Sequence, residues 1–457
     1  MHDRVLFFYA SFVFAAAVLL GGGTAVGQFS DQLVEVLSVP LLFLGLSRLM
    51  GRRWEPGWAP ALALLVLILA LPLLQLVPLP PAIWTLLPGR ASVVAVLEAA
   101  GLPIGWRSMS LAPFATLYSF LSLLPAAALF VAALQLEASS RYRLLIVPLA
   151  IAGLSGLLGV VQFVSRDASD ISMQGAANVG FAIGFFANRN HYAALIYTML
   201  PFAVVWTVQA TRRHRDRTWF LGVLFGGAVV ASLLAGMSAA FSRAGVALGV
   251  VSLLGSAFIV WRSGRASRLG RWPVIIAGVC LLGFAAVMQL GLVQLLIQRS
   301  AVDGSRRSIA RLTLEAIQNY SFAGSGFGTF VPVFKAFEQP SDIIVFYINH
   351  AHNDFLELTL EGGILASLLI ALFLLWYFRQ FWSIWLSSVY SGSASQRLLA
   401  SAASLSIGLL LLHSLLDYPL RTITLMTSFA VAAAFMALPP PESEQAPPQR
   451  RRRASRA

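Results

Sequence analysis

Apolar runs of about 20 residues, the length that a helix needs to cross a bilayer, recur along this whole sequence. They fall at residues 5–22, 32–48, 57–77, 112–135, 144–164, 191–210, 219–240, 244–260, 273–296, 358–378, 398–416 and 422–438. Only 11% of the 457 residues are charged, against roughly a quarter in a soluble protein. The pattern predicts an all-α polytopic membrane protein with about 12 transmembrane helices. It excludes a soluble enzyme, a nucleic-acid binder and a secreted disulfide scaffold.

The basic residues predict the orientation. If both termini are cytoplasmic, the inner loops carry 21 of the 32 Lys and Arg residues and the outer segments carry 11. The arginine clusters at 212–217 and 262–271 then lie on the cytoplasmic side, as the positive-inside rule requires. We therefore expect a membrane domain at 1–438, a disordered basic cytoplasmic tail at 439–457, and one large outer loop at about 297–357, between spans nine and ten.

A cluster of polar residues lies at the junction of that loop and span ten: His350, His352, Asn353, Asp354 and Glu357. Asp354 and Glu357 are three residues apart, so they share one face of a helix that Asn353 or Asp354 can cap. A well-capped helix with two surface histidines is the simplest interpretation. A metal site of His350, His352 and Asp354 is an alternative, although no HxxxH or HExxH spacing is present.

Two further groups lie where spans are expected to meet the outer interface. Arg189, Asn190 and His191 lie where span six begins, and their hydrogen-bonding side chains suit a sugar or phosphate headgroup. An interfacial anchor is the alternative. Arg243 lies in a sharp turn between spans seven and eight, and its guanidinium must lie along the surface or enter an outward cavity.

Three arginines lie close together in the large loop, within six residues of one another. Arg307 and Arg311 are four residues apart and share a face if this segment is helical, and Arg306 precedes them. Arginines on one face form an anion site suited to phosphate or pyrophosphate, whereas a solvated charge run is the alternative. Farther along, His413, Asp417 and Arg421 recur at steps of four residues, which predicts a structural ion pair.

The middles of the predicted spans carry almost no ionisable groups. An ion-coupled transporter would place such groups at mid-membrane. The placement therefore favours chemistry at the outer interface.

Several tracts resemble one family. From Ser305 to Leu365 an arginine-led segment is followed by SFAGSGFGTF (321–330) and HAHNDFLELTLEGGILA (350–366). The weaker landmarks MSLAPFATL, FFANRNHYAAL, FSRAG and HSLLDYPLR occur in the family's order. The sequence thereby resembles the O-antigen ligase and O-antigen polymerase superfamily of bacterial inner-membrane proteins.

The resemblance implies a glycosyltransferase that uses no nucleotide sugar and needs no metal or cofactor. Its donor would be a glycan on undecaprenyl pyrophosphate. Its acceptor would be the lipid A core for a ligase or another lipid-linked glycan for a polymerase, and other polysaccharide assembly proteins are candidate partners. Transfer would take place at the periplasmic face of the inner membrane.

By the same resemblance, Arg243 and either Arg306 or Arg307 would hold the pyrophosphate, and His352 would be the base. Attack opposite the leaving group would invert the anomeric carbon. We further expect His350, Asn353 and Asp354 to position His352, and Arg189 and His191 to bind donor or acceptor. A transporter of a lipid-linked sugar or small anion and a non-catalytic assembly subunit are the alternatives.

Overall fold

A computed structural model describes residues 2–24, 27–51, 55–165, 181–210, 217–263, 299–340, 347–387 and 392–437. Nine helices of these residues are long and apolar enough to cross a membrane. They are α1 (His2–Leu20), α2 (Phe29–Met50), α6 (Pro113–Gln135), α8 (Ile146–Ser165) with the preceding α7 (Ala138–Leu144), α9 (Arg189–Ala210), α10 (Arg217–Ala239), α11 (Arg243–Arg262), α15 (Asp354–Trp385) and α16 (Ala394–Ser414). Two shorter apolar helices, α3 (Ala59–Gln75) and α17 (Ile423–Met436), fall at two other predicted spans.

These helices confirm an all-α multi-pass membrane protein. The predicted span at 273–296 and the tail at 439–457 lie outside the described residues. The helix at the predicted span 358–378 is longer at both ends, because Asn353 caps it at the start and the apolar sequence continues to Trp385.

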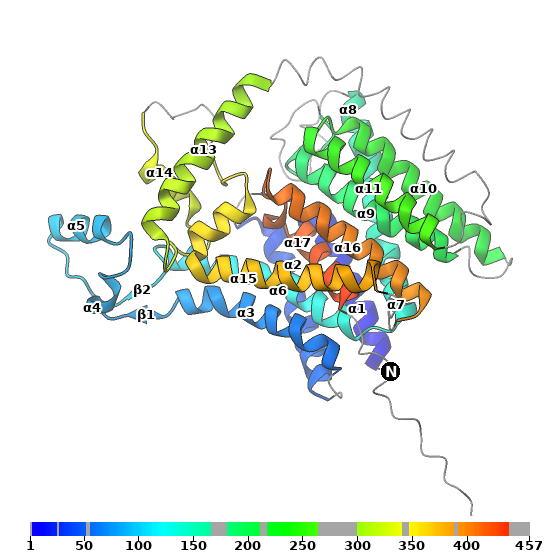
Figure 1. Ribbon diagram of the computed structural model, residues 1–457, viewed down its shortest axis with the longest axis horizontal. Coiled ribbons are helices and arrows are strands. Elements are labelled where there is room, and N and C mark those ends of the chain that lie inside the picture. The colour runs from blue at the N-terminus through cyan, green and yellow to red at the C-terminus, as the bar shows by residue number, and fades with distance from the viewer. Residues whose placement is uncertain are drawn as a thin grey trace, which may run out of the picture.

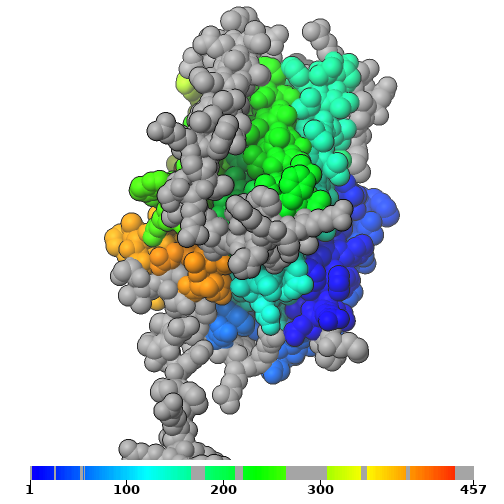
Figure 2. All heavy atoms as spheres, turned by 90° about the vertical axis from the view of Figure 1, so that its right-hand side faces the viewer, coloured from blue at the N-terminus to red at the C-terminus, as the bar shows by residue number. Residues whose placement is uncertain are grey.

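The helices form one bundle with a large apolar core. Helices α2 and α17 pack on α6, α8 to α11 pack as a second group, and α16 joins the two groups through α9 and α17 (Figure 1). Figure 2 shows the face that lies on the right in Figure 1. On this face, segments from both halves of the sequence lie together, coloured blue, turquoise, green and orange.

The hydrophilic segments gather at one end of this bundle (Figure 1). The segment after α3 forms a two-stranded antiparallel ribbon, β1 (Pro78–Leu79) with β2 (Arg107–Ser108), and the short helices α4 (Pro81–Trp84) and α5 (Ala91–Ala99). The large loop forms α13 (Arg299–Tyr320) and α14 (Phe330–Phe337). Short 3₁₀ helices precede α3 (η1, Pro56–Trp58) and α17 (η2, Pro419–Arg421).

The loop has a small core of its own between α13, α14 and the start of α15, with Leu312, Phe334 and Leu360 in its interior. Arg90 connects the segment that contains β1 and β2 to this core. Its fully buried guanidinium donates to the carbonyls of Met109 and Gly324, the latter at 3.1 Å. The hydrophilic segments therefore pack together as one layer at this end of the bundle.

The glycine run 324–328 is part of this packing. Backbone N–H groups of Ser325 and Gly326 donate to the carbonyls of Leu360 and Glu361, at 3.0 and 2.9 Å. Those carbonyls are available because α15 is broken at Gly363, whose φ is +62° and ψ −150°. A Cβ at Gly363 would lie 2.4 Å from the carbonyl oxygen of Phe322, so only glycine fits. The glycine run thus fixes the start of α15, where the predicted site residues lie.

Candidate functional site

A buried carboxylate, Asp417, lies at the centre of the site. It lies in the turn between the end of α16 and Pro419, and its side chain is 1% exposed. Its Oδ1 lies 2.8 Å from Nδ1 of His352 and accepts the backbone N–H of Tyr418 at 3.1 Å. Its Oδ2 accepts a hydrogen bond from Nδ2 of Asn190 at 2.6 Å and lies 3.5 Å from Nη2 of Arg306. One carboxylate thereby joins the turn after α16 to α9, α13 and the start of α15.

The charge on this carboxylate is stabilised. Burial on its own raises the pKa of Asp417, but the hydrogen bond from His352 and the nearby histidines outweigh that effect and hold the pKa well below its usual value. Asp417 is therefore ionised at neutral pH.

His352 is held on both sides by the start of α15. The preceding backbone N–H, of Ala351, donates to Oε2 of Glu357 at 2.8 Å. The following residue, Asn353, accepts the N–H of Leu356 and donates to the carbonyl of Leu415, which confirms the prediction that Asn353 can cap the helix. His352 itself has a φ of +51°, a conformation that costs a non-glycine residue about 1–2 kcal/mol. In this conformation its Nδ1 lies within hydrogen-bonding distance of Asp417.

The hydrogen bond to Asp417 also determines which ring nitrogen of His352 is reactive. A carboxylate only accepts hydrogen bonds, so the proton of a neutral imidazole must be on Nδ1. Nε2 then carries the free lone pair. The side chain is 26% exposed. This is the arrangement of a general base whose orientation is fixed by a buried acid.

Arg189 has two other arginines near it, Arg243 and Arg306, and Arg306 also contacts Asp417 of this pair. Arg189 and Arg243 are the first residues of α9 and α11, and Arg306 lies on α13. Arg189 is close enough to Arg243 and Arg306 for their charges to repel. Two helix N-termini add positive partial charge. Such a concentration of positive charge is stabilised by a bound anion.

Side-chain contacts hold the residues at these two helix starts. Ser242 accepts the N–H of Gly245 as the N-cap of α11, and its hydroxyl donates to Oδ1 of Asn190 at 2.8 Å. The guanidinium of Arg189 lies over the ring of Phe181, 4.1 Å from its centroid. Asn190 therefore connects the start of α11 to Asp417, and the turn at 241–243 is adjacent to the predicted start of span six.

Tyr418 is surrounded by three histidines. Its ring centroid lies 4.7 Å from that of His191, 4.2 Å from that of His350 and 5.1 Å from that of His352. Burial raises the pKa of Tyr418 well above its usual value, with the charge of Asp417 adding to the effect. His191 is completely buried and neither ring nitrogen has a hydrogen-bond partner among the described residues.

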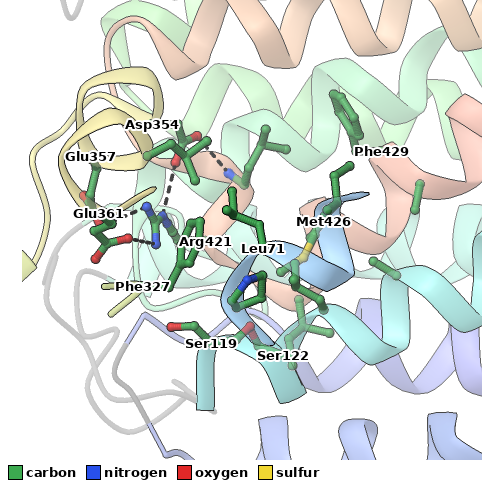
Figure 3. A pocket seen from close by; sticks show the side chains of 18 of the residues that line it. Leu71, Ser119, Ser122, Phe327, Asp354, Glu357, Glu361, Arg421, Met426 and Phe429 are labelled. Carbon is green, nitrogen blue, oxygen red and sulfur yellow. Dashed lines mark hydrogen bonds and ion pairs between the residues drawn. The ribbon is translucent and has the colours of Figure 1, made fainter. Parts of the chain in front are cut away.

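A second cluster surrounds Arg421 (Figure 3). Its Nη1 lies 2.9 Å from Glu361 and its Nη2 lies 3.4 Å from Glu357, while its Nε lies 3.8 Å from Asp354. These three carboxylates are at most 2% exposed. Burial on its own lowers the pKa of Arg421, but the three carboxylates outweigh that effect and raise it above its usual value.

The predicted ion pair of His413, Asp417 and Arg421 is not formed. Helix α16 ends at Ser414, so the steps of four residues leave the helix. Arg421 turns to the carboxylates of α15, and Nδ1 of His413 lies 2.5 Å from the hydroxyl of Tyr197. Sequence reasoning gave Asp417 a structural role and missed its contact with His352. The only sequence signal was its location in the family landmark HSLLDYPLR.

The other predicted residues divide into two groups. His350 pairs with Glu357 at 2.8 Å, and Asp354 accepts the hydroxyl of Ser414 at 2.7 Å. Both are thus next to His352 but bound to other partners. Arg307 and Arg311 are exposed on α13, and Arg311 pairs with Glu315. Among the described residues, no group of His, Cys, Asp or Glu is arranged to hold a metal ion.

Residues 228–371 match the family model described as O-antigen ligase. The match confirms the resemblance that the sequence motifs indicated. It spans the second half of α10, all of α11, α13 and α14, and α15 as far as residue 371, and so includes Arg243, Arg306 and His352. A search of curated proteins found no match. The family and the membrane-spanning helices together support a membrane protein that processes glycans.

Proposed function

We propose that this protein is a glycosyltransferase that moves a glycan from undecaprenyl pyrophosphate to an acceptor hydroxyl at the periplasmic face of the bacterial inner membrane. The observation that carries the proposal is the pair of His352 and buried Asp417, 2.8 Å apart, with Arg306 in contact with Asp417. Arg189 is near both Arg306 and Arg243, which adds positive charge. Displacement of a diphosphate by a hydroxyl requires a base for the hydroxyl and, next to it, a site that binds the diphosphate anion.

His352 is the general base in this mechanism. Its Nε2 takes the proton of the acceptor hydroxyl as the oxygen attacks the anomeric carbon. The imidazole becomes an imidazolium, which Asp417 stabilises through Nδ1. The new glycosidic bond forms as the bond from the anomeric carbon to the diphosphate breaks, and its electron pair leaves with the diphosphate.

The arginines stabilise that leaving group. Charge develops on the diphosphate oxygen as the bond breaks, and guanidinium groups that are already in position stabilise that charge. Arg306 is the family arginine in this assignment, because it faces Asp417 whereas Arg307 is exposed. Arginine can supply this charge without a divalent ion. Direct attack opposite the leaving group inverts the anomeric carbon.

The same proposal includes the surroundings of the site. The termini are cytoplasmic, because the arginine-rich segments at 212–217, 262–271 and 439–457 follow the positive-inside rule in that orientation. The donor is a lipid in the bilayer. The acceptor is the lipid A core or another lipid-linked glycan.

Neighbouring arginines on α13 provide the test. Arg306→Ala should reduce transfer by about 10²–10³-fold, the usual effect of removing one stabilising donor, whereas Arg307→Ala should transfer within about threefold of wild type. Both variants are expressed in a deletion strain, and the glycan profile is compared at equal protein abundance. Equal activity of the two variants, or loss with Arg307→Ala alone, would refute the assignment. Activity that stops in chelator and returns with a divalent metal would refute metal independence.

The deletion strain itself separates the two branches of the family. Loss of attachment with long carrier-bound chains indicates a ligase, and single repeats alone indicate a polymerase. Movement of an unmodified lipid-linked sugar across proteoliposomes would instead identify a transporter.

A further inference from the structure

Asn190 lies in the first turn of α9, and both ends of its amide group are bound by neighbouring side chains. Its Nδ2 donates to Oδ2 of Asp417 at 2.6 Å, and its Oδ1 accepts the hydroxyl of Ser242 at 2.8 Å. Its backbone N–H donates to Oδ1 of Asn188 at 2.8 Å. The protein itself therefore holds this side chain, in contrast to the headgroup contact that the sequence suggested.

The two partners determine which chemical group position 190 needs. Ser242 is buried, and its hydroxyl oxygen already accepts the N–H of Gly245 at 3.1 Å. The hydroxyl hydrogen of Ser242 therefore needs an acceptor, whereas the ionised Asp417 needs a donor. A carboxamide supplies both in one short side chain. A carboxylate would bring an oxygen against Asp417, and an aliphatic side chain would leave both partners without a hydrogen bond.

Asp417 depends on this contact because it does not lie in a helix. Helix α16 ends at Ser414, and the carboxylate projects from the turn that follows. Helix α9, in contrast, packs against α8, α10, α11 and α16, so Asn190 lies on a well-supported element. The amide holds Oδ2 of Asp417, while Oδ1 of the same carboxylate holds Nδ1 of His352 at 2.8 Å. A carboxylate that rotated would shift the imidazole with it.

The other end of the amide reaches the arginine side of the site. Ser242 is the N-cap of α11, and Arg243 is the first residue of that helix. Three successive contacts, of 2.8, 2.6 and 2.8 Å, join this helix start to the ring of His352. The proposed base and the start of α11 are thus linked within the protein itself.

We infer that Asn190 is a positioning residue for glycan transfer, which acts through Asp417 to hold the imidazole of His352 in place for the acceptor hydroxyl. The inference rests on the proposed function, in which His352 is the base, and it gives Asn190 a role other than headgroup binding. A displaced reacting group can cost about 10²-fold in rate even when every group is present. Loss of the amide should therefore slow transfer and leave donor binding intact.

Asn190→Leu keeps the approximate shape of the side chain and removes both hydrogen bonds. Transfer is measured in a complemented deletion strain at equal protein abundance, and binding of undecaprenyl pyrophosphate is measured on the purified full-length protein in nanodiscs. We expect transfer to fall by about 10–10²-fold and the dissociation constant to stay within about threefold of wild type. Asn319→Leu, at an exposed position on α13, is the matched control and should transfer within about threefold of wild type. Binding weakened by more than about threefold in Asn190→Leu, or transfer at the wild-type rate, would overturn the inference.

A double-mutant cycle tests whether Asn190 acts through Asp417. In an Asp417→Asn background, Asn190→Leu should lower transfer by less than about a further threefold, because the carboxylate that it orients is already absent. Losses that multiply in the double variant would give Asn190 an independent role and contradict the inference while the proposed function stands. Normal transfer by Asp417→Asn would instead refute the proposed function itself.

A second variant separates positioning from folding. Asn190→Asp has nearly the same size and still accepts the hydroxyl of Ser242, but it places an oxygen against Oδ2 of Asp417. Transfer should fall by about 10–10²-fold, as in Asn190→Leu, and thermal melting gives the amount of folded protein in each variant. Loss of transfer in proportion to loss of folded protein in both variants would give Asn190 a structural role only and overturn the inference.

Discussion

Replacing Asp417 with asparagine removes one negative charge and keeps the shape of the side chain. The carboxylate contacts donors on His352, Asn190 and the backbone N–H of Tyr418, at 2.8, 2.6 and 3.1 Å. An amide has one oxygen for these three donors, and its NH₂ group faces at least one of them. The variant therefore loses both the fixed orientation of His352 and the charge that stabilises the imidazolium.

The expected effect is large. A positioned general base contributes about 10²–10⁴-fold to a reaction rate, which corresponds to roughly 3–5.5 kcal/mol of transition-state stabilisation. Loss of charged hydrogen bonds also lowers the free energy of unfolding by about 1.5–3 kcal/mol. We expect Asp417→Asn to lower transfer by about 10²–10⁴-fold while membrane insertion and donor binding persist.

The assay is the glycan profile of a deletion strain complemented with each variant, normalised to protein abundance. Glu315→Gln is the matched control, because it makes the same acid-to-amide change at an exposed position on α13. Transfer by Asp417→Asn within about threefold of wild type would refute the assignment of His352 and Asp417 as base and orienting acid. A loss of folded protein in proportion to lost transfer would assign Asp417 a structural role only.

Three further predictions concern stability. The pKa of Asp417 is held below its usual value of about 3.9, so the stability that its charge contributes is fully present above about pH 4 and is lost as the pH falls toward the folded-state pKa. The difference in melting temperature between wild type and Asp417→Asn should therefore shrink from pH 5 to pH 3. A difference that grows over this range would contradict the prediction. Gly363→Ala should lower the melting temperature more than Gly101→Ala. Both residues have φ near +63°, but a Cβ at Gly363 would clash with the carbonyl oxygen of Phe322, whereas a Cβ at Gly101 would meet no atom within 4 Å. Equal losses would show that the contact with the glycine run is unimportant. Arg421→Met leaves three buried carboxylates without their cation and should cost about 3–5 kcal/mol in the free energy of unfolding, measured by denaturation in detergent; a loss below about 1 kcal/mol would contradict the burial of charge at this position.

The membrane helices were predictable because each needs only one local property, a run of apolar residues long enough to span the bilayer. The cap of α15 by Asn353 was predictable for the same reason, since capping involves residues three apart. The family landmarks also led to the segments that carry Arg189, Arg243 and His352. In each case the signal lies within one short stretch of sequence.

The partner of His352 was not predictable, because the contact joins residues 65 positions apart. The step of four residues from His413 to Asp417 suggested a shared helix face, but α16 ends at Ser414 and Asp417 turns toward α9 and α15. Likewise, the sequence could not choose between Arg306 and Arg307. That choice depends on the rotation of α13 about its own axis, which its packing against α15 determines.

The most direct test of the account is transfer by His352→Gly with and without added imidazole. Glycine adopts a φ of +51° without strain, and this gain offsets part of the stability that is lost with the hydrogen bond to Asp417. The account predicts that transfer falls by about 10²–10⁴-fold, that donor binding is retained, and that imidazole restores part of the activity by occupying the vacated position beside Asp417. Transfer by His352→Gly at the wild-type rate would contradict the central claim that this histidine is the base.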